Sequence, residues 1–515
     1  MNSETRNDTV ALIAICLAAL MSGLEISSVP AILPTLAPLL HAGIKQMQWI
    51  MNAYTIACTT VLMATGTLAD RFGRKKIFIA SVIVFGITSL LCGLARTAEV
   101  LIASRFLQGI GGGAMLICLI AVLTHQFRDP KARSKAFGWW GIVFGFGLGF
   151  GPIIGGVIVA LSNWKWVFLV HVALSVLTLI LVLNGVQESS DPEAKRLDLP
   201  GIATLTLAVL GLTCFITQGP DLGFGSVYAL GLLAVTGISL LLFYLFEKTR
   251  PHPMFDFSVF HIRDFSGAIL GSAGMNFSFW PFMIYLPIFF QIGLGYGSVP
   301  TGLSLLAYTL PTLTVPPLAE RLSLRYRPGI VIPCGLFVIG TGFLFMIYGS
   351  SVANPSWLSM LPGCLLAGTG LGLTNTPVTN TTTGSVSSSR AGMATGIDMS
   401  ARLITLAVNI ALMGFLLEAG ILSYLKKALA GAVNDAQLRT LAEAATTATT
   451  SRTAAHEVIL HAALLHGFRV VMLYAGIGVW MLASASSLVF NLRLSKRARS
   501  GALQAGACER QKCIG

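Results

Sequence analysis

The sequence predicts an all-α polytopic membrane protein with fourteen transmembrane helices. Composition, apolar runs and the placement of basic residues carry this prediction. Of the 515 residues, 54% are hydrophobic and only 11% are charged, and the mean hydropathy of +0.77 is far too apolar for a soluble protein of this size. The net charge of +13 does not indicate nucleic-acid binding, because the cations lie in short clusters between apolar runs, where membrane topology explains them.

Each apolar run is long enough to cross a hydrocarbon core about 30 Å thick at about 1.5 Å per residue. The first six runs lie at roughly 10–34, 48–69, 77–95, 99–123, 136–160 and 166–184. Two more lie between polar linkers, at roughly 199–218 and 226–246, and the last six lie at roughly 266–290, 299–319, 330–349, 357–380, 395–418 and 467–491. The runs therefore predict two six-helix bundles with two helices inserted between them.

This pattern predicts four parts of the chain. They are an N-terminal six-helix bundle at 1–186, two inserted helices with flanking linkers at 187–264, a C-terminal six-helix bundle at 265–491 with a long periplasmic loop at about 419–466, and a basic cytoplasmic tail at 492–515. An internal repeat agrees, because Leu318-Ala319-Glu320-Arg321 echoes Leu68-Ala69-Asp70-Arg71 at a separation of 250 residues.

Basic residues predict the orientation. With a cytoplasmic N-terminus and strict alternation of spans, 24 of the 34 Lys and Arg residues lie inside and eight lie outside. The remaining two, Arg105 and Arg402, lie within spans. We therefore expect a multi-pass protein of the cell's inner membrane with both termini in the cytoplasm.

Enzymatic function is not expected. The sequence has no Gly-x-x-x-x-Gly-Lys loop, so ATP-driven transport by this chain is not indicated, and it has neither a His-Glu-x-x-His zinc motif nor a Gly-x-Ser-x-Gly nucleophile elbow. Seven of the nine cysteines lie in apolar segments without metal-ligand spacing. No catalytic residue, metal site or nucleic-acid partner is predicted.

The run at 48–69 ends in a cationic turn, Asp70-Arg71-Phe72-Gly73-Arg74-Lys75-Lys76. Preceded by Gly66-Thr67-Leu68-Ala69, this string resembles the signature loop between helices 2 and 3 of the major facilitator superfamily and matches it at every fixed position. The resemblance implies that Asp70, Arg71, Gly73 and Arg74 are gating residues. Asp70 would contact the start of the thirteenth span, around 392–396, where free helix amides attract a carboxylate.

Further strings carry the same resemblance, most of them in the first half. These are Arg105-x-x-Gln108-Gly109-x-Gly111, Gly147-x-x-x-Gly151-Pro152-x-x-Gly155-Gly156, Trp164-Lys165-Trp166, Leu286-Pro287, and Leu24-Glu25 followed by Pro34. The last is similar to the fourteen-helix drug:proton antiporters, with Glu25 in place of their usual aspartate. The resemblance implies export driven by the proton-motive force, without a cofactor, by alternating access. It implies a small-molecule substrate and a lipid bilayer as partners, and it allows a periplasmic adaptor protein.

Glu25 and Arg105 are the candidate coupling residues, because ionisable groups inside spans are costly and usually mark function. Counted along their helices, they lie about 22 Å and about 20 Å from the inner edge of the membrane, so they share a depth. Glu25 would bind a proton or a cation, and Arg105 would favour its release. A static buried ion pair is the alternative. His171 also lies in a span, where a lone histidine is more often a packing residue.

Gly147, Gly151 and Gly155 recur every four residues and predict a smooth face for close helix packing, while Pro152 can bend the helix. Packing alone would explain these glycines as well as a gating role between the halves does. Candidate side chains for a substrate cavity are Tyr54, Asn276, Phe279, Trp280 and Tyr285. The alternative is that these aromatics are packed or face lipid.

Three functions stay open at this point. The first is proton-coupled export of drugs or amphiphilic molecules, and the second is proton-coupled transport of one metabolite or siderophore-like compound, in either direction. The third is a membrane scaffold or sensor that has lost transport, which the presence of Glu25, Asp70 and Arg105 argues against.

Overall fold

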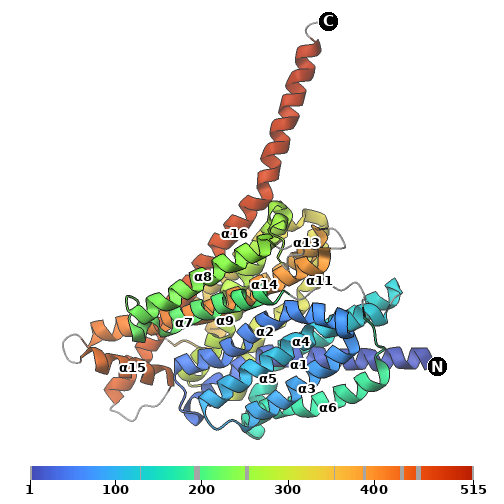
Figure 1. Ribbon diagram of the computed structural model, residues 1–515. Coiled ribbons are helices and arrows are strands. Elements are labelled where there is room, and N and C mark those ends of the chain that lie inside the picture. The colour runs from blue at the N-terminus through green and yellow to red at the C-terminus, as the bar shows by residue number, and fades with distance from the viewer. Residues whose placement is uncertain are drawn as a thin grey trace.

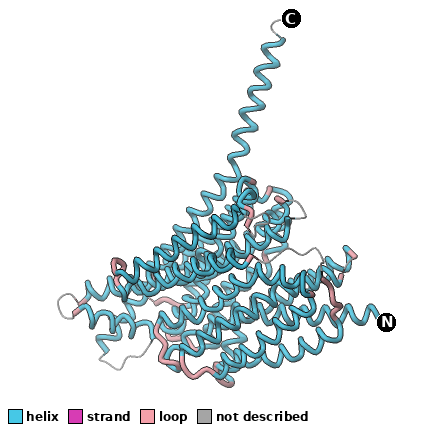
Figure 2. The backbone as a smooth tube through the Cα atoms, viewed as in Figure 1, coloured by secondary structure: helices cyan, strands magenta, loops and turns pink. Residues whose placement is uncertain are grey.

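The computed structural model describes residues 3–127, 129–190, 198–249, 255–352, 354–386, 390–429, 434–447 and 454–512. Within these ranges the chain consists of helices joined by short turns and loops, with no strand (Figures 1 and 2). The predicted all-α fold class is confirmed. Parts of the predicted linkers, at 191–197 and 250–254, lie outside the described residues.

The N-terminal half contains six helices. They are α1 (Ser3–Leu39), α2 (Ile44–Phe72), α3 (Arg74–Leu94), α4 (Ala98–Gln126), α5 (Pro130–Leu161) and α6 (Lys165–Gly185). Side-chain caps begin two of them: the Thr97 hydroxyl accepts from the Val100 amide at 3.4 Å, and the Asp129 carboxylate accepts from the Ala132 amide at 2.8 Å. Each cap satisfies an amide that lacks an intrahelical partner, and the short turns place consecutive helices antiparallel.

The C-terminal half is built from helices of more varied length, one of its predicted spans being interrupted. They are α9 (Arg263–Ile288), α10 (Ser298–Thr314), α11 (Pro316–Tyr326), α12 (Pro328–Gly349), α13 (Trp357–Gly384), α14 (Ala391–Ala428) and α16 (Ala454–Lys512). The run predicted as one span at 299–319 is divided between α10 and α11. Pro316 and Pro317 cause the break, because neither residue has an amide hydrogen for the helix ladder.

The segment predicted as a long loop, at about 419–466, is mostly helical. α14 continues to Ala428, α15 spans Asp435–Thr447, and α16 begins at Ala454. The sequence prediction allowed short helices within this connection, and composition explains them, because the segment is rich in alanine, the residue with the highest helix propensity. Residues 430–433 and 448–453 of this segment lie outside the described ranges.

The two helices between the halves, α7 (Leu199–Leu222) and α8 (Val227–Thr249), pack against each other as a pair. α7 also packs against α2 of one half and α14 of the other. The Thr206 hydroxyl donates to that of Thr60 on α2 at 3.2 Å, and Leu205 and Val209 share an apolar cluster with Ile397 of α14. The inserted pair therefore lies along one seam between the halves.

Twelve described helices are long and apolar enough to cross a membrane. All of them coincide with predicted spans, which makes the chain a multi-pass membrane protein. The other two predicted spans correspond to α2, which has 29 residues, and α10, which has 17, and neither is among the twelve. The count of fourteen transmembrane helices therefore stays a prediction.

The helices run between two ends of the molecule. One is the Asp70 end, which contains residues 70–76, and the other is the α15 end, which contains Asp435–Thr447. The two halves bond to each other toward the α15 end. There the Gln291 side-chain amide, in the short helical turn just after α9, donates to the Ala31 carbonyl of α1 at 3.0 Å. At the same end Lys45 of α2 pairs with Asp221 of the inserted helix α7 at 2.5 Å. Toward the Asp70 end the helices of the two halves diverge (Figure 1).

Candidate functional site

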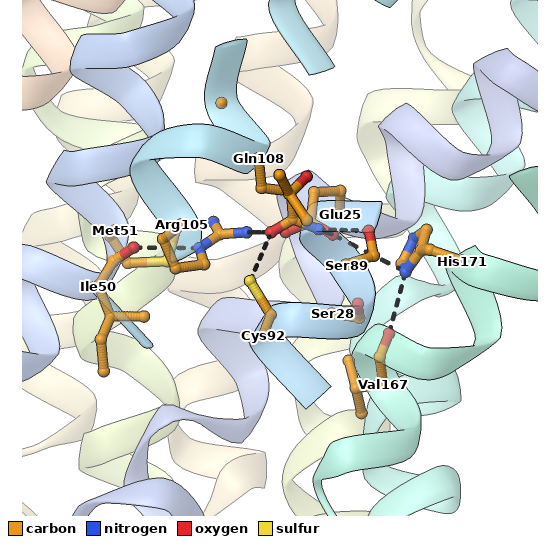
Figure 3. Close-up of polar contacts among 12 residues, drawn as sticks. Glu25, Ser28, Ile50, Met51, Ser89, Cys92, Arg105, Gln108, Val167 and His171 are labelled. Atoms are coloured by element: carbon orange, nitrogen blue, oxygen red, sulfur yellow. Dashed lines mark hydrogen bonds and ion pairs between the residues drawn. The ribbon is translucent and has the colours of Figure 1, made fainter. Parts of the chain in front are cut away.

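The candidate site is a buried ion pair inside the N-terminal half. Glu25 projects from α1 and Arg105 from α4, and Arg105 Nη1 donates a hydrogen bond to Glu25 Oε1 (Figure 3). Neither side chain has any exposed surface. The structure thus brings together the two residues that the depth argument predicts to lie at the same level of the membrane.

Contacts with α2 and α4 hold the Arg105 side chain in place. Its Nε donates to the Ile50 carbonyl at 3.1 Å, and its Nη1 also donates to Gln108 Oε1 at 2.7 Å. The guanidinium carbon lies 4.3 Å from the centre of the Tyr54 ring, a cation–π contact. Arg105 therefore has fixed partners besides Glu25, which keep the guanidinium in position whether or not the carboxylate is charged.

Gln108 and Ser89 continue the polar cluster on the other side of Glu25. Gln108 Nε2 donates to Glu25 Oε2 at 3.2 Å and to the Ser89 hydroxyl at 2.9 Å (Figure 3). His171 Nδ1 lies 3.8 Å from Glu25 Oε2 and 3.0 Å from the Val167 carbonyl. The carboxylate is thus surrounded by side chains of α3, α4 and α6, although it stands on α1.

Two polar atoms of this cluster lack a hydrogen-bond partner among the described residues, namely Arg105 Nη2 and His171 Nε2. Unpaired buried polar atoms are rare and costly, and they mark a site that is incompletely satisfied in this state. A proton on Glu25 would remove the charge that holds Arg105, while Gln108 Oε1 and the Ile50 carbonyl would still accept from the guanidinium. The arrangement can therefore exist in a charged and a neutral form.

Sequence reasoning missed part of this cluster. It named Gln108 only as a motif residue, interpreted His171 as packing, and did not name Ser89. Their signal was present, because Gln108 stands one turn after Arg105 and His171 is a polar residue in an otherwise apolar span. Ser89 carried no such signal, since a serine in a span usually bonds to its own helix backbone.

The turn at the Asp70 end is held within the N-terminal half. Asp70 pairs with Arg74 of the following helix at 2.8 Å, with the Asp70 side chain 40% exposed. Gly73 has φ +109°, a conformation that side chains rarely adopt, and a Cβ there would collide with the Glu188 carboxylate. Glu188 accepts from the Lys75 amide at 3.0 Å and so caps α3.

Among the side chains that the structure describes, none at the start of α14 forms the predicted bond to Asp70. Within the described part of the chain, the ion pair of Asp70 is with Arg74. Arg71 is exposed, and its guanidinium lies 5.4 Å from the ring of Phe72. The gating roles of these residues stay predictions.

The glycine face of α5 packs closely, as the four-residue spacing predicts, and its partner is α1 of the same half. A Cβ on Gly147 would lie 2.9 Å from the Leu20 carbonyl, one on Gly155 would lie 3.1 Å from Ser28, and one on Gly151 would overlap Ser27. The two halves also meet along a second seam, between α5 and α10, and its contacts come from other α5 positions. The Gly149 carbonyl accepts from the Thr309 hydroxyl of α10 at 2.7 Å, and the Pro152 carbonyl lies against Gly302.

The predicted cavity side chains are mostly packed inside their own half. Phe279 is fully buried and stacks on Tyr308 with the ring centres 4.0 Å apart, and buried Tyr285 donates to the Ile410 carbonyl. Asn276 bonds to the Ser272 carbonyl at 2.9 Å, and Trp280 is partly buried against Phe279. Tyr54 lies beneath Arg105. These contacts favour the packing interpretation in this state.

Comparisons with known proteins agree with this architecture. The family model described as Major Facilitator Superfamily matches residues 15–410. The multidrug resistance protein Stp of Mycobacterium tuberculosis is 30% identical over 439 residues, which cover 85% of this chain and 81% of that protein. The methylenomycin A resistance protein of Streptomyces coelicolor is 27% identical over 411 residues, covering 79% of this chain and 86% of that protein.

A solved structure supports the same fold. It is a bacterial homolog of the human lysosomal transporter Spinster, in an inward-facing and unoccupied conformation. The match has a TM-score of 0.62 and covers 94% of this chain and 98% of that one, at 15% sequence identity. At this identity the likeness concerns the fold alone.

Proposed function

Because this chain belongs to the major facilitator superfamily and is a membrane transporter of small molecules, we propose that it exports drugs or other amphiphilic solutes in exchange for protons. The observation that carries the proposal is the fully buried pair of Glu25 and Arg105. A carboxylate inside a membrane span is costly to maintain and usually serves transport or proton transfer. The relatives that bear the names of drug-resistance proteins, among them Stp and the methylenomycin A resistance protein, favour drugs over a single metabolite as substrate.

In this mechanism Glu25 carries the proton. With Glu25 ionised, Arg105 holds α1 and α4 together through the ion pair. When the carboxylate takes a proton, the pair loses its electrostatic attraction, and α1 is free to move relative to α4.

Alternating access would then be a rocking of the two halves about the seams. If the Asp70 end faces the cytoplasm, as the distribution of basic residues indicates, bonds such as Gln291 to Ala31 close the outer side, and the state is open inward. Release of Asp70 from Arg74 would let it contact α14 when the inner side closes. No cofactor is needed, since the proton-motive force supplies the energy.

The test is transport into inverted membrane vesicles of several chemically unrelated dyes, with and without a pH gradient. Glu25→Gln should abolish uptake driven by the gradient while the protein stays folded, because glutamine keeps the volume and cannot titrate. Glu99→Gln, an exposed carboxylate on the helix that carries Arg105, is the matched control and should behave as wild type.

Unchanged gradient-driven transport by Glu25→Gln would overturn the assignment of the proton site. Uptake of only one compound of the panel would instead identify a transporter specific for a single metabolite. Absence of transport for every compound, by a wild-type protein that is folded, would favour a scaffold or sensor.

A further inference from the structure

A second buried ion pair lies in the C-terminal half. Asp398 and Arg402 stand one turn apart on α14, with 3.0 Å between Asp398 Oδ2 and Arg402 Nη2, and Arg402 Nε donates to the same oxygen at 3.2 Å. The Asp398 side chain is fully buried, whereas that of Arg402 is 12% exposed. This pair is separate from Glu25, which belongs to the opposite half.

Arg402 has acceptors other than Asp398. Its Nη1 donates to Asn375 Oδ1 at 2.5 Å and its Nη2 to the Thr379 hydroxyl at 3.0 Å, both on α13. Two hydrogen bonds would therefore remain if Asp398 became neutral. The partly exposed guanidinium could also be solvated, so a neutral Asp398 does not leave an isolated buried cation.

Ser272 of α9 is the partner that suits both forms of the carboxyl group. Its hydroxyl donates to Asp398 Oδ1. A hydroxyl can donate or accept, so the same side chain can accept a hydrogen bond from a protonated Asp398 by rotating its hydrogen. An amide or guanidinium donor has no such freedom. The site therefore satisfies the ionised and the protonated carboxyl group with the same residues.

The groups around Asp398 come from three helices. Asp398 pairs with Arg402 of its own helix and accepts a hydrogen bond from Ser272 of α9. Asn375 and Thr379 of α13 bond to Arg402 and so contact Asp398 only indirectly. Among the bonds of the described residues, Arg402 is the charged partner of Asp398. One positive charge thus opposes one titratable carboxylate.

Other residues of α14, some of them within one turn of Asp398, take part in the seam between the halves. Ala394, Ile397 and Ala407 share an apolar cluster with Ile56 of α2 and Leu205 of α7. If the bonds of Asp398 changed, α14 would shift against α9 and α13. That shift would alter the apolar contacts where the two halves meet. This places a carboxyl group on a helix that borders the seam and must shift during alternating access.

We propose that Asp398 is a second proton-binding site of the transporter, with Arg402 as its counter-ion and Ser272 as the partner that serves both protonation states. The proposal rests on the proposed proton coupling, and it makes the exchange two protons per cycle, one on each half. Asp398 gains and loses a proton without any other covalent change.

The first experiment detects the proton directly. Infrared difference spectra of the full-length protein in nanodiscs are recorded during a pH titration, following the carbonyl band of protonated carboxyl groups. Asp398→Asn should remove one titrating component and Glu25→Gln another, while Glu320→Gln, an exposed carboxylate on α11 of the same half, should remove neither buried component. A spectrum of Asp398→Asn that keeps every buried component would overturn the proposal and leave a static ion pair.

The second experiment counts protons. In vesicles without a membrane potential, a gradient of one pH unit supports a limiting substrate gradient of about 100-fold for two protons and about 10-fold for one. Asp398→Asn should lower the limiting substrate gradient from about 100-fold to about 10-fold. An unchanged limiting gradient would contradict the proposal. Lack of any pH-driven transport by wild type would instead refute the proposed function, while the infrared titration still decides whether Asp398 binds a proton.

A folding defect in Asp398→Asn would come from the arginine left without its counter-charge. The double variant Asp398→Asn with Arg402→Gln removes both charges and keeps polar groups for Ser272, Asn375 and Thr379. It should fold, lack the same infrared component and show the same tenfold lower gradient. A double variant that folds and retains both wild-type properties would overturn the proposal.

Discussion

Each half of the molecule buries one carboxylate–arginine pair, and the two pairs are held in different ways. Glu25 and Arg105 come from different helices, and both are fully buried. Asp398 and Arg402 share one helix turn, and the arginine is partly exposed. The first pair therefore joins two helices, whereas the second is local to α14. Breaking the first pair should therefore alter the packing of α1 against α4, while protonating the second should mainly change how α14 packs on its neighbours.

The largest expected difference between the pairs is in stability. Arg105→Ala leaves Glu25 buried beside a cavity, and removing one partner of a buried pair costs about 3–5 kcal/mol in the free energy of unfolding. Arg402→Ala should cost less, about 1–3 kcal/mol, because that side chain already reaches the surface and Ser272 still bonds to Asp398.

Thermal unfolding of the purified variants in detergent, with the folded yield, measures this difference. Arg325→Ala, which removes an exposed cation from α11, is the control and should change stability little. Equal losses for Arg105→Ala and Arg402→Ala would show that the difference in burial has no energetic consequence.

A smaller difference is expected in the pH profile of transport when the serine of each site is removed. Ser272 bonds to its carboxylate directly, whereas Ser89 reaches Glu25 only through Gln108. Ser272→Ala removes a donor that favours the charged form, so protonation becomes easier and the pH profile of transport should move upward, by up to about one pH unit. Ser89→Ala should leave the profile in place. A downward shift for Ser272→Ala, or equal shifts for both variants, would contradict the comparison.

The smallest effect concerns a surface pair at the beginning of the helix that carries Asp398. Hydrogen bonds from Ser258 hold the pKa of Asp256 below its ordinary value, and Arg390 at 3.1 Å acts in the same direction. A folded-state pKa below the unfolded one stabilises the protein above the unfolded pKa, and this stabilisation is lost as the pH falls through the folded pKa.

Asp256→Asn should therefore lower stability by less than about 1 kcal/mol at neutral pH, as expected of an exposed pair, and the difference from wild type should vanish in acid. Unfolding temperatures of both proteins across the acidic range measure this. High salt should shrink the difference at neutral pH as well. A difference that grows in acid would show that Asp256 acts through some contact other than its charge.

Much of the fold follows from the sequence, because hydrophobic length determines where a helix crosses the membrane. Apolar runs and basic clusters predict the helices and their grouping. The errors have local causes: Pro316 and Pro317 divide one run into two helices, and alanine-rich sequence forms helix where a loop was predicted.

The site was predictable only where a residue is unusual for its surroundings. Glu25 and Arg105 are charges in apolar runs, and counting residues along two helices predicts their pairing. Asp398 carries the same signal, a carboxylate four residues before Arg402 within a span, yet it was not singled out because it lies near the predicted start of its run at 395. Ser272 and Ser89 could not be predicted, since the choice of partner depends on how α9 and α3 are rotated in the bundle.

The position of α7 makes the protein asymmetric toward the lipid. The halves meet along two seams, α2 with α14 and α5 with α10, and α7 packs over the first of them. The α5–α10 seam is itself closed in this state by bonds such as that from the Thr309 hydroxyl to the Gly149 carbonyl at 2.7 Å. A solute dissolved in the bilayer should therefore enter sideways between α5 and α10, and not between α2 and α14, only when the halves separate there. Lipid-soluble photoreactive probes that label α5 and α10 in preference to the α2–α14 seam would establish such one-sided lateral entry, and equal labelling of both seams would exclude it.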